Sequence, residues 1–155
     1  MRKKQKGFSL IELLIVVTII LIIAGIAIPN LLNSRITANE AAAVSTLRTL
    51  NSMTLAYYSQ CGGYPPSLVA LGPPANGCTT TDLIDSVLAT GNRSGYVFIF
   101  NAVDVNGDGK MDTYTIVADP ASRGTTGRRS FFTDQSGVIR ANLNTTADVN
   151  STPIP

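Results

Sequence analysis

The sequence predicts an α+β fold, in which a long N-terminal α-helix packs on a small antiparallel β-sheet. Three observations lead to this prediction. An apolar block runs from Phe8 to Ile28, an amphipathic stretch without Gly or Pro follows over Leu31–Tyr58, and the second half contains short segments of alternating polarity. The chain of 155 residues is long enough for one ordinary domain beyond the apolar block.

The apolar block has the length of a membrane span. Phe8–Ile28 contains one charged residue, Glu12, and as a helix it measures roughly 30 Å, the thickness of a bilayer core. Four basic residues precede it, namely Arg2, Lys3, Lys4 and Lys6. The positive-inside rule places residues 1–6 in the cytoplasm and the C-terminus outside it.

The formal net charge of +2 comes from that basic segment. Without it the chain carries 8 basic and 10 acidic residues, so the charge does not indicate a nucleic-acid partner. The adjacent pair Arg128-Arg129 beside Phe131 and Phe132 is interpreted as a charged strand edge, with a small basic-aromatic patch as the alternative.

Three interpretations of the apolar block compete. An ordinary cleaved secretory signal, cut near Ala24–Ala27, would have a shorter apolar region without an acid. A plain signal anchor leaves Glu12 unexplained, since an ionised carboxylate in hydrocarbon costs on the order of 2–3 kcal/mol and therefore needs a partner. The third interpretation uses all of these residues together.

The segment Lys6-Gly7-Phe8-Ser9-Leu10-Ile11-Glu12 resembles the prepilin cleavage and methylation motif of type IV pilins and type II secretion pseudopilins. The resemblance covers residues 1–30 and includes Pro29 at the end of the apolar run. It implies that a prepilin peptidase cuts between Gly7 and Phe8 and that the new Phe8 amine is N-methylated. In such filaments the acid at the position of Glu12 is thought to meet the N-terminal amine of a neighbouring subunit. The subunit's own Phe8 amine is the alternative partner.

Gly25 and Pro29 mark the weakest turn of the predicted helix. Pro29 has no N–H and clashes with the carbonyl of Gly25. A simple kink explains this pattern, whereas the resemblance implies local melting when subunits pack into a filament.

Beyond Pro29 the helix is predicted to continue to about Tyr58. Large apolar residues step by three or four and form one stripe of Val44, Leu47, Leu50, Met53 and Tyr57. The polar residues are assigned mainly to other faces, and they are Glu40, Ser45, Arg48, Asn51 and Ser52.

A loop rich in Gly and Pro is predicted over Gln60–Asn76, the place where pilin families have a variable loop. Cys61 and Cys78 can form a disulfide in an oxidising compartment. A short helix is predicted over Asp82–Ala89, capped from the run Thr79–Thr81.

Four strands are predicted to form an antiparallel meander on the amphipathic helix. They cover residues 96–101, 113–118, 129–133 and 138–141, with a hairpin turn at Asp134–Gly137. Segments of this region look similar to the C-terminal domains of small pilin-like proteins, so the predicted fold is pilin-like. The predicted division of the chain is a leader peptide (1–7), a transmembrane and assembly helix (8–30), an outer domain (31–141) and a polar tail (142–155).

The loop between the first and second predicted strands has the spacing of an EF-hand-type calcium loop. Asp104, Asn106, Asp108 and Asp112 fall at positions 1, 3, 5 and 9, with Gly109 at position 6 and the Lys110 carbonyl at position 7. Position 12 is Thr115 instead of Glu, and strands flank the loop. Calcium binding is therefore one interpretation, favoured by the calcium that major pseudopilins hold, and a hairpin turn on Asn106-Gly107 or Asp108-Gly109 is the other.

We predict that the chain is no enzyme, because the sequence lacks histidine and motifs for nucleophilic or phosphate chemistry. The predicted function is a structural subunit of a type IV pilus-like filament. The alternatives are a pseudopilin of a type II secretion system and a non-polymerising bitopic membrane protein whose outer domain binds calcium or another ligand. The expected partners are copies of the chain, the prepilin peptidase, an inner-membrane assembly platform, minor pilins and the membrane. The expected location is the inner membrane, followed by a surface pilus or a periplasmic pseudopilus.

Overall fold

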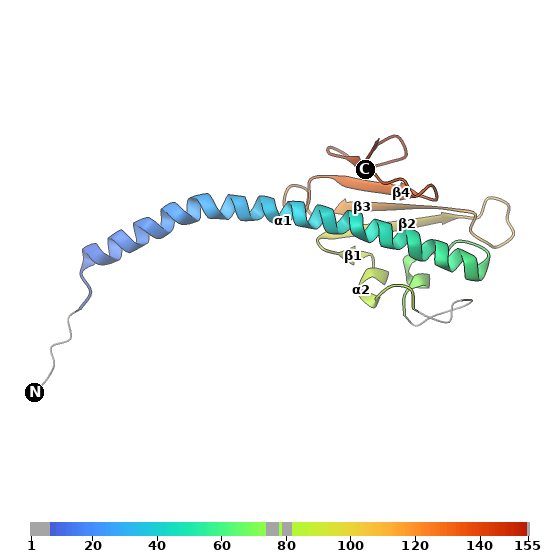
Figure 1. Cartoon of the computed structure of the whole chain (residues 1–155), viewed down its shortest axis with the longest axis horizontal. Helices are drawn as coiled ribbons and strands as arrows, with labels where there is room; N and C mark the ends of the chain where they lie inside the picture. Colours follow the sequence, from blue (N-terminus) through green and yellow to red (C-terminus); the bar gives the residue numbers. More distant parts are fainter. Residues whose placement is uncertain (1–6, 74–77, 79–81, 155) are drawn as a thin grey trace, which may run out of the picture. The chain divides into compact units, whose positions relative to one another are not determined.

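The computed structural model describes residues 7–73, 78 and 82–154. Its helices are α1 (Leu10–Cys61), the 3₁₀ helix η1 (Leu68–Leu71) and α2 (Ser86–Ala89) (Figure 1). Its strands are β1 (Asn92–Arg93), β2 (Tyr96–Val103), β3 (Thr113–Pro120), β4 (Ser130–Asp134), β5 (Arg140–Asn142) and β6 (Thr152–Pro153). The predicted α+β class is confirmed.

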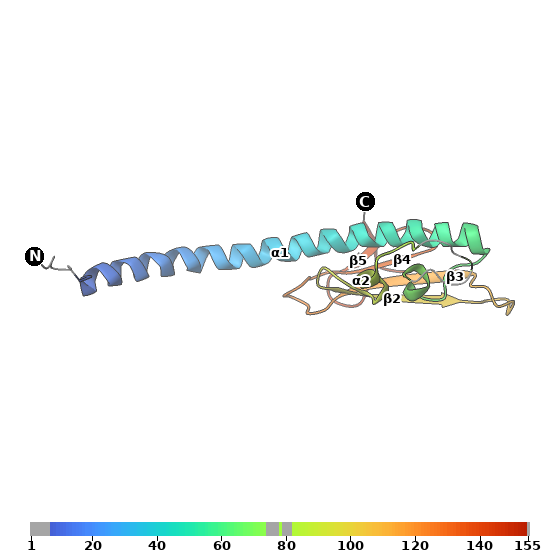
Figure 2. The ribbon, with the colours of Figure 1, turned by 90° about the horizontal axis from the view of Figure 1, so that it is seen from below.

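The chain divides into two compact units, Met1–Arg35 and Ile36–Pro155. The described part of the first unit consists of a short non-helical segment and the first half of α1. The second unit contains the rest of α1 and the sheet, with one helix face lying along the strands (Figure 2).

The sheet is an antiparallel meander in the order β1-β2-β3-β4-β5-β6. The four predicted strands correspond to β2–β5, and β1 and β6 add one edge strand at each side. β1 pairs with β2 through a two-residue turn in which Ser94 (φ 50°) and Gly95 (φ 73°) both adopt positive φ. That geometry suits the twist of a hairpin, so the dipeptide Ser94-Gly95 was a turn signal that the sequence analysis missed.

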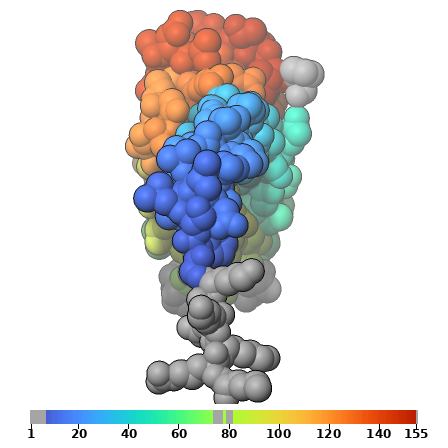
Figure 3. All heavy atoms as spheres, turned by 90° about the vertical axis from the view of Figure 1, so that its left-hand side faces the viewer, coloured from blue at the N-terminus to red at the C-terminus, as the bar shows by residue number. Residues whose placement is uncertain are grey.

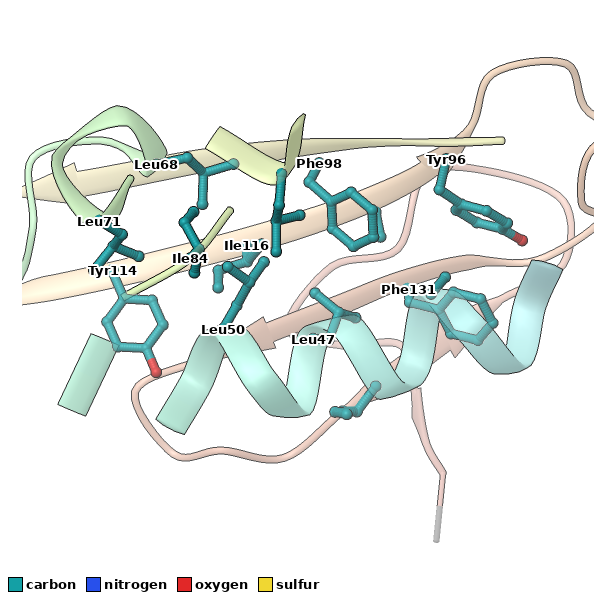
Figure 4. Close-up of a cluster of buried hydrophobic side chains, with 14 residues drawn as sticks. Leu47, Leu50, Leu68, Leu71, Ile84, Tyr96, Phe98, Tyr114, Ile116 and Phe131 are labelled. Atoms are coloured by element: carbon teal, nitrogen blue, oxygen red, sulfur yellow. The ribbon is translucent and has the colours of Figure 1, made fainter. Parts of the chain in front are cut away.

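The core lies between α1 and the inner face of the sheet (Figure 4). Leu47 and Leu50 of the helix are fully buried there. On the strands, Tyr96, Tyr114 and Ile116 are at most 1 % exposed. The side chains of β2 and β3 alternate between core and surface with period two, which agrees with the alternating polarity of the predicted strands. Burial of these large side chains supplies the main stabilisation of the unit.

Helix α2 is shorter than predicted and has a different cap. The backbone N–H of Leu88 donates to Oδ1 of Asp85 over 2.9 Å, so Asp85 is the N-cap residue. The predicted cap in Thr79–Thr81 lies outside the described residues. The helix was predicted to begin at Asp82, but it begins only after Asp85, whose backbone has the extended conformation of an N-cap residue.

Residues 142–155 were expected to form a polar tail, and that prediction is wrong for the described part. β6 pairs with β5, and the N–H of Ile154 donates to the carbonyl of Ile139 over 2.9 Å. Ala147 is buried, and its N–H donates to Oγ of the buried Ser130 over 2.9 Å. The C-terminal segment folds against the sheet because its backbone forms these hydrogen bonds. In Figure 3 its red atoms lie directly beside the orange part of the domain.

Candidate functional site

The apolar half of α1 is the first candidate site. Its large side chains are exposed on all sides, from Leu10 (81 %) through Ile19 (53 %) to Leu31 (69 %). Among the described residues α1 is a helix long and apolar enough to cross a membrane, with a mean hydropathy of 3.0 over its most apolar 18 residues. Such a surface needs lipid or other apolar helices to cover it.

The predicted cleavage point lies just before this helix. Gly7, Phe8 and Ser9 are non-helical, and Phe8 is 83 % exposed. The bond between Gly7 and Phe8 is therefore accessible and outside the hydrogen-bonded helix. The processing itself stays a prediction.

Glu12 makes a local contact at the helix start. Its Oε2 accepts a hydrogen bond from the backbone N–H of Ser9 over 2.8 Å. Ser9 precedes the first helical residue and Glu12 is the third, so the pair has the spacing of a capping box. In the unprocessed chain the Glu12 carboxylate therefore has the Ser9 N–H as its partner. The sequence analysis had considered only the Phe8 amine, either of a neighbouring subunit or of the same subunit.

Gly25 and Pro29 lie inside α1, which is continuous through both residues. Apart from the backbone of the same helix turn and the two neighbouring residues, nothing lies within 4 Å of a Cβ built at Gly25, so this glycine is open to its surroundings. The melting implied by the resemblance concerns a packed filament and stays a prediction.

A disulfide joins Cys61 to Cys78, as the sequence analysis predicted, with 5.5 Å between the Cα atoms. Cys61 is the last residue of α1, so the bond ties the helix end to the following loop. Tyr64 of that loop pairs with Met111 and donates its N–H to the Met111 carbonyl over 2.8 Å. The end of the helix is thereby linked to the loop between β2 and β3.

The loop from Asp104 to Asp112 connects β2 and β3 as a hairpin. Asp104 accepts hydrogen bonds from the N–H groups of Gly107 (2.7 Å) and Gly109 (2.8 Å), and Asp112 accepts one from Val105 (2.8 Å). The bond from Gly109 is the largest cause of a lowered pKa of Asp104. Gly107 and Gly109 both adopt positive φ, as the hairpin-turn interpretation requires.

The donor chemistry of this loop suits calcium, but its arrangement does not establish a site. Oxygens from Asp104, Asn106, Asp108, Asp112 and the Lys110 carbonyl are the ligand type that calcium prefers. The described residues contain no gathering of three or more acidic or cysteine side chains positioned to hold a metal. The hydrogen bonds within the loop support the turn, and calcium binding stays a prediction.

Two polar residues that the sequence analysis assigned to helix faces outside the apolar stripe are buried against the sheet. Glu40 is 7 % exposed, and its Oε1 accepts from the N–H groups of Arg128 (2.9 Å) and Arg129 (3.1 Å). Its Oε2 accepts from Nε of Arg129 over 2.8 Å. Burial alone would raise the pKa of Glu40, but these hydrogen bonds and the Arg129 charge outweigh it, and the pKa is lowered from its ordinary value.

Asn51 is the second such residue and is 8 % exposed. Its Nδ2 donates to Oγ1 of Thr133 over 3.0 Å, and its Oδ1 accepts from the hydroxyl of Tyr114 over 3.1 Å. Burial raises the pKa of Tyr114 to about 12, so the phenol keeps its proton and serves as the donor. The spacing of Glu40, Ala43, Leu47, Leu50, Asn51 and Thr54 on one helix face was a signal for this burial.

The Arg129 side chain makes two contacts within its own domain. Its Nε binds Glu40, and its guanidinium carbon lies 5.3 Å from the centroid of the Phe131 ring. These contacts within the domain agree with the interpretation of a charged strand edge.

A long apolar helix that continues into an amphipathic half on an antiparallel meander is the pilin-like architecture expected from the sequence. The profile of the prokaryotic N-terminal methylation motif matches residues 2–28. The chain is 32 % identical over 128 residues to the type IV wide pilus major component PilA4 of Thermus thermophilus, covering 77 % of this chain and 98 % of that protein.

Two further relatives are type II secretion system core proteins G. The protein of Dickeya chrysanthemi is 32 % identical over 72 residues, covering 46 % of this chain and 47 % of the relative. That of Escherichia coli is 30 % identical over 94 residues, covering 61 % and 62 %. The match thus spans about half to two thirds of these relatives and nearly all of PilA4. The chain belongs to the family of type IV pilins and type II secretion pseudopilins.

Proposed function

We propose that this protein is made as a prepilin and serves as a structural subunit of a type IV pilus-like filament. The observation that carries the proposal is the alignment with the Thermus pilus component, which includes 98 % of that protein and therefore extends well beyond the N-terminal motif. The motif at residues 2–28 supports processing by a prepilin peptidase.

In the proposed maturation, the peptidase cuts between Gly7 and Phe8 and the Phe8 amine is N-methylated. The exposed, non-helical segment Gly7–Ser9 supports this step, because a peptidase needs an accessible and extended substrate. Residues 1–6 would remain in the cytoplasm, and the outer domain would lie on the other side of the membrane.

In the proposed assembly, the apolar half of α1 leaves lipid and packs against the same helix of other copies. The exposed side chains on all faces of this segment support it, since neighbouring helices can replace lipid without exposing apolar surface to water. Glu12 would exchange its bond to Ser9 for the Phe8 amine of a neighbouring subunit. An assembly platform and minor pilins of the inner membrane would be the further partners.

A pseudopilin of a type II secretion system is the second candidate function. The matches to core proteins G favour it, although they cover a smaller part of this chain than the pilus relative does. A bitopic protein that never polymerises is the third, and the match to 98 % of the length of a major pilus component speaks against it.

Electron microscopy of cells that express the protein at native level, with and without deletion of its gene, tests the proposal. We expect long surface fibres that contain the protein and disappear on deletion. Absence of fibres together with secreted enzymes trapped in the periplasm would establish the pseudopilin. A chain that keeps its leader and stays in the inner-membrane fraction would establish the non-polymerising alternative.

A further inference from the structure

The register between α1 and the sheet is weakly specified by apolar packing. The helix residues with no exposed surface that face the sheet are Ala43, Leu47, Leu50 and Thr54, spaced by four, three and four. Under a slip of about one helical turn, roughly 5.4 Å, Leu50 takes the place of Leu47. Leu47 then meets the site of Ala43 and Thr54 that of Leu50, so only part of the apolar contact forms again. Because burial of apolar area is not directional, it discriminates poorly between such neighbouring arrangements.

Polar contacts are directional, and two buried ones join this helix face to β4. Glu40 binds the N–H groups of Arg128 and Arg129 and the Arg129 side chain just before β4. Asn51 binds Thr133 near the other end of β4 and also the Tyr114 hydroxyl of β3.

The spacing of the two contacts is matched on both elements. Glu40 and Asn51 lie eleven residues apart, which is roughly 16 Å along a helix. Arg129 and Thr133 lie four residues apart, which is roughly 13 Å along a strand. Both pairs run in the same direction, so the two contacts form together in one register of the helix.

A register shifted by one helical turn separates these groups from the partners that they have in this structure. Glu40 would lose three donors and Asn51 would lose one donor and one acceptor, while Thr133 (0 % exposed) and Tyr114 (1 % exposed) would lose theirs as well. Unpaired buried polar groups are more costly than the same groups left in water, and a buried carboxylate is the most costly.

We propose that Glu40 and Asn51 are positioning residues that select the axial register of α1 on the sheet. The inference deepens the proposed function and rests on it for its consequence. A subunit that assembles through the N-terminal half of this helix would carry any slip of the register into the placement of its outer domain in the filament. Buried polar groups that fix a helix register at some expense of stability are known in other helical assemblies.

The test uses the full chain in detergent micelles with two spin labels, introduced by Ser52→Cys on the helix and Gln135→Cys in the β4–β5 turn. Both sites are exposed. Pulsed dipolar spectroscopy measures the distance distribution between the labels and does not depend on filament formation. One narrow distance is expected for the otherwise wild-type chain.

The variant that weakens the Glu40 contact and removes the Asn51 contact is Glu40→Gln, Asn51→Leu, Tyr114→Phe and Thr133→Val. It replaces both sides of the Asn51 contact with apolar groups, a change that is nearly neutral for stability when the shapes agree. Glu40→Gln retains an oxygen for the two backbone donors and presents an amide to Arg129. We expect a folded protein with a second distance, displaced by about 5 Å, and a filament yield at least tenfold lower.

Thr49→Leu is the matched control, because it makes a polar residue of the same helix apolar at an exposed position. It should keep the single distance and the filament yield. A folded four-fold variant with an unchanged single distance would overturn the proposal. A variant that unfolds would also overturn it, since the contacts would then supply stability instead of selecting a register. Lack of filaments from the wild-type chain would count against the proposed function and leave the distance measurement unaffected.

Discussion

Nε of Arg129 donates a hydrogen bond to Oε2 of Glu40 over 2.8 Å, although the two residues lie 89 positions apart in the chain. The bond joins the start of the domain's helix to the entry of β4. Together with the two backbone bonds to Oε1, it gives the buried carboxylate three donors.

Glu40→Ala is expected to lower the free energy of unfolding by roughly 2–4 kcal/mol, because two backbone donors lose their acceptor in a buried place. Glu40→Gln should lower it less, since one oxygen remains for those donors. Urea denaturation of both variants at pH 7 measures the difference. Equal stability of the Ala variant and the wild type would show that water replaces the carboxylate without loss.

The contribution of Glu40 should depend on pH in a defined direction. Its pKa in the folded protein is lowered from the ordinary value of 4.5, so the ionised form is stabilised by folding. The contribution is therefore complete above pH 4.5 and is lost as the pH falls from there through the lowered pKa. The stability difference between wild type and Glu40→Gln should shrink over that acidic range and stay constant between pH 5 and 7.

The mature protein is expected to begin at Phe8 and to carry one N-methyl group. Mass spectrometry of the N-terminal peptide from purified protein measures both features. A chain that still begins at Met1, or one that begins near Ala24–Ala27, would contradict the prepilin interpretation and favour a signal anchor or an ordinary secretory signal.

Glu12→Ala is expected to block filament assembly and to leave membrane insertion intact, because removal of an acid eases insertion. Glu12→Gln separates two roles of this residue. It can still accept the hydrogen bond from Ser9 but cannot pair as an anion with an amine, so it should also fail to assemble. Filament yield and membrane fractionation are the measurements, and normal fibres from either variant would argue against the charge pairing.

Reduction of the disulfide between Cys61 and Cys78 is expected to lower the free energy of unfolding by about 3 kcal/mol, as estimated for a closed loop of this size. The double variant Cys61→Ser and Cys78→Ser should match the reduced wild type. Non-reducing peptide mapping of exported protein gives an independent check, and two free thiols there would be incompatible with the pairing.

Experiments on the loop from Asp104 to Asp112 distinguish a simple hairpin turn from a calcium site. Asp104→Ala should lower the melting temperature in the presence of a chelator, because the N–H groups of Gly107 and Gly109 lose their acceptor. The calcium hypothesis predicts in addition that millimolar calcium raises the melting temperature of the wild type. It further predicts that Asp108→Asn, which keeps an oxygen for the Lys110 N–H, abolishes that rise.

Local patterns in the sequence predicted a large part of the fold. The period of two in Tyr96, Phe98 and Phe100 predicted strand β2, and Asp134–Gly137 was correctly assigned as a hairpin turn. These features depend on neighbouring residues, so a single stretch of chain contains the necessary information.

Burial of polar side chains was less accessible to the same reasoning. Glu40 and Asn51 look like solvent-facing residues of an amphipathic helix, and their donors lie 63 to 89 positions away. The C-terminal segment looks like a tail, yet Ala147 and Ile154 find partners on Ser130 and Ile139. A local sequence pattern does not identify hydrogen-bond partners that come together only when the chain folds.

The sequence by itself determined the apolar span, the processing motif around Gly7 and Phe8, the position of Glu12 and the order of helix and strands, since each follows from residue type and spacing along one segment. The tertiary structure decided which face of α1 meets the sheet, which acid becomes buried and how the chain closes at β6. Those outcomes depend on hydrogen bonds between residues far apart in the chain, and such bonds have directions and distances that only the folded arrangement fixes.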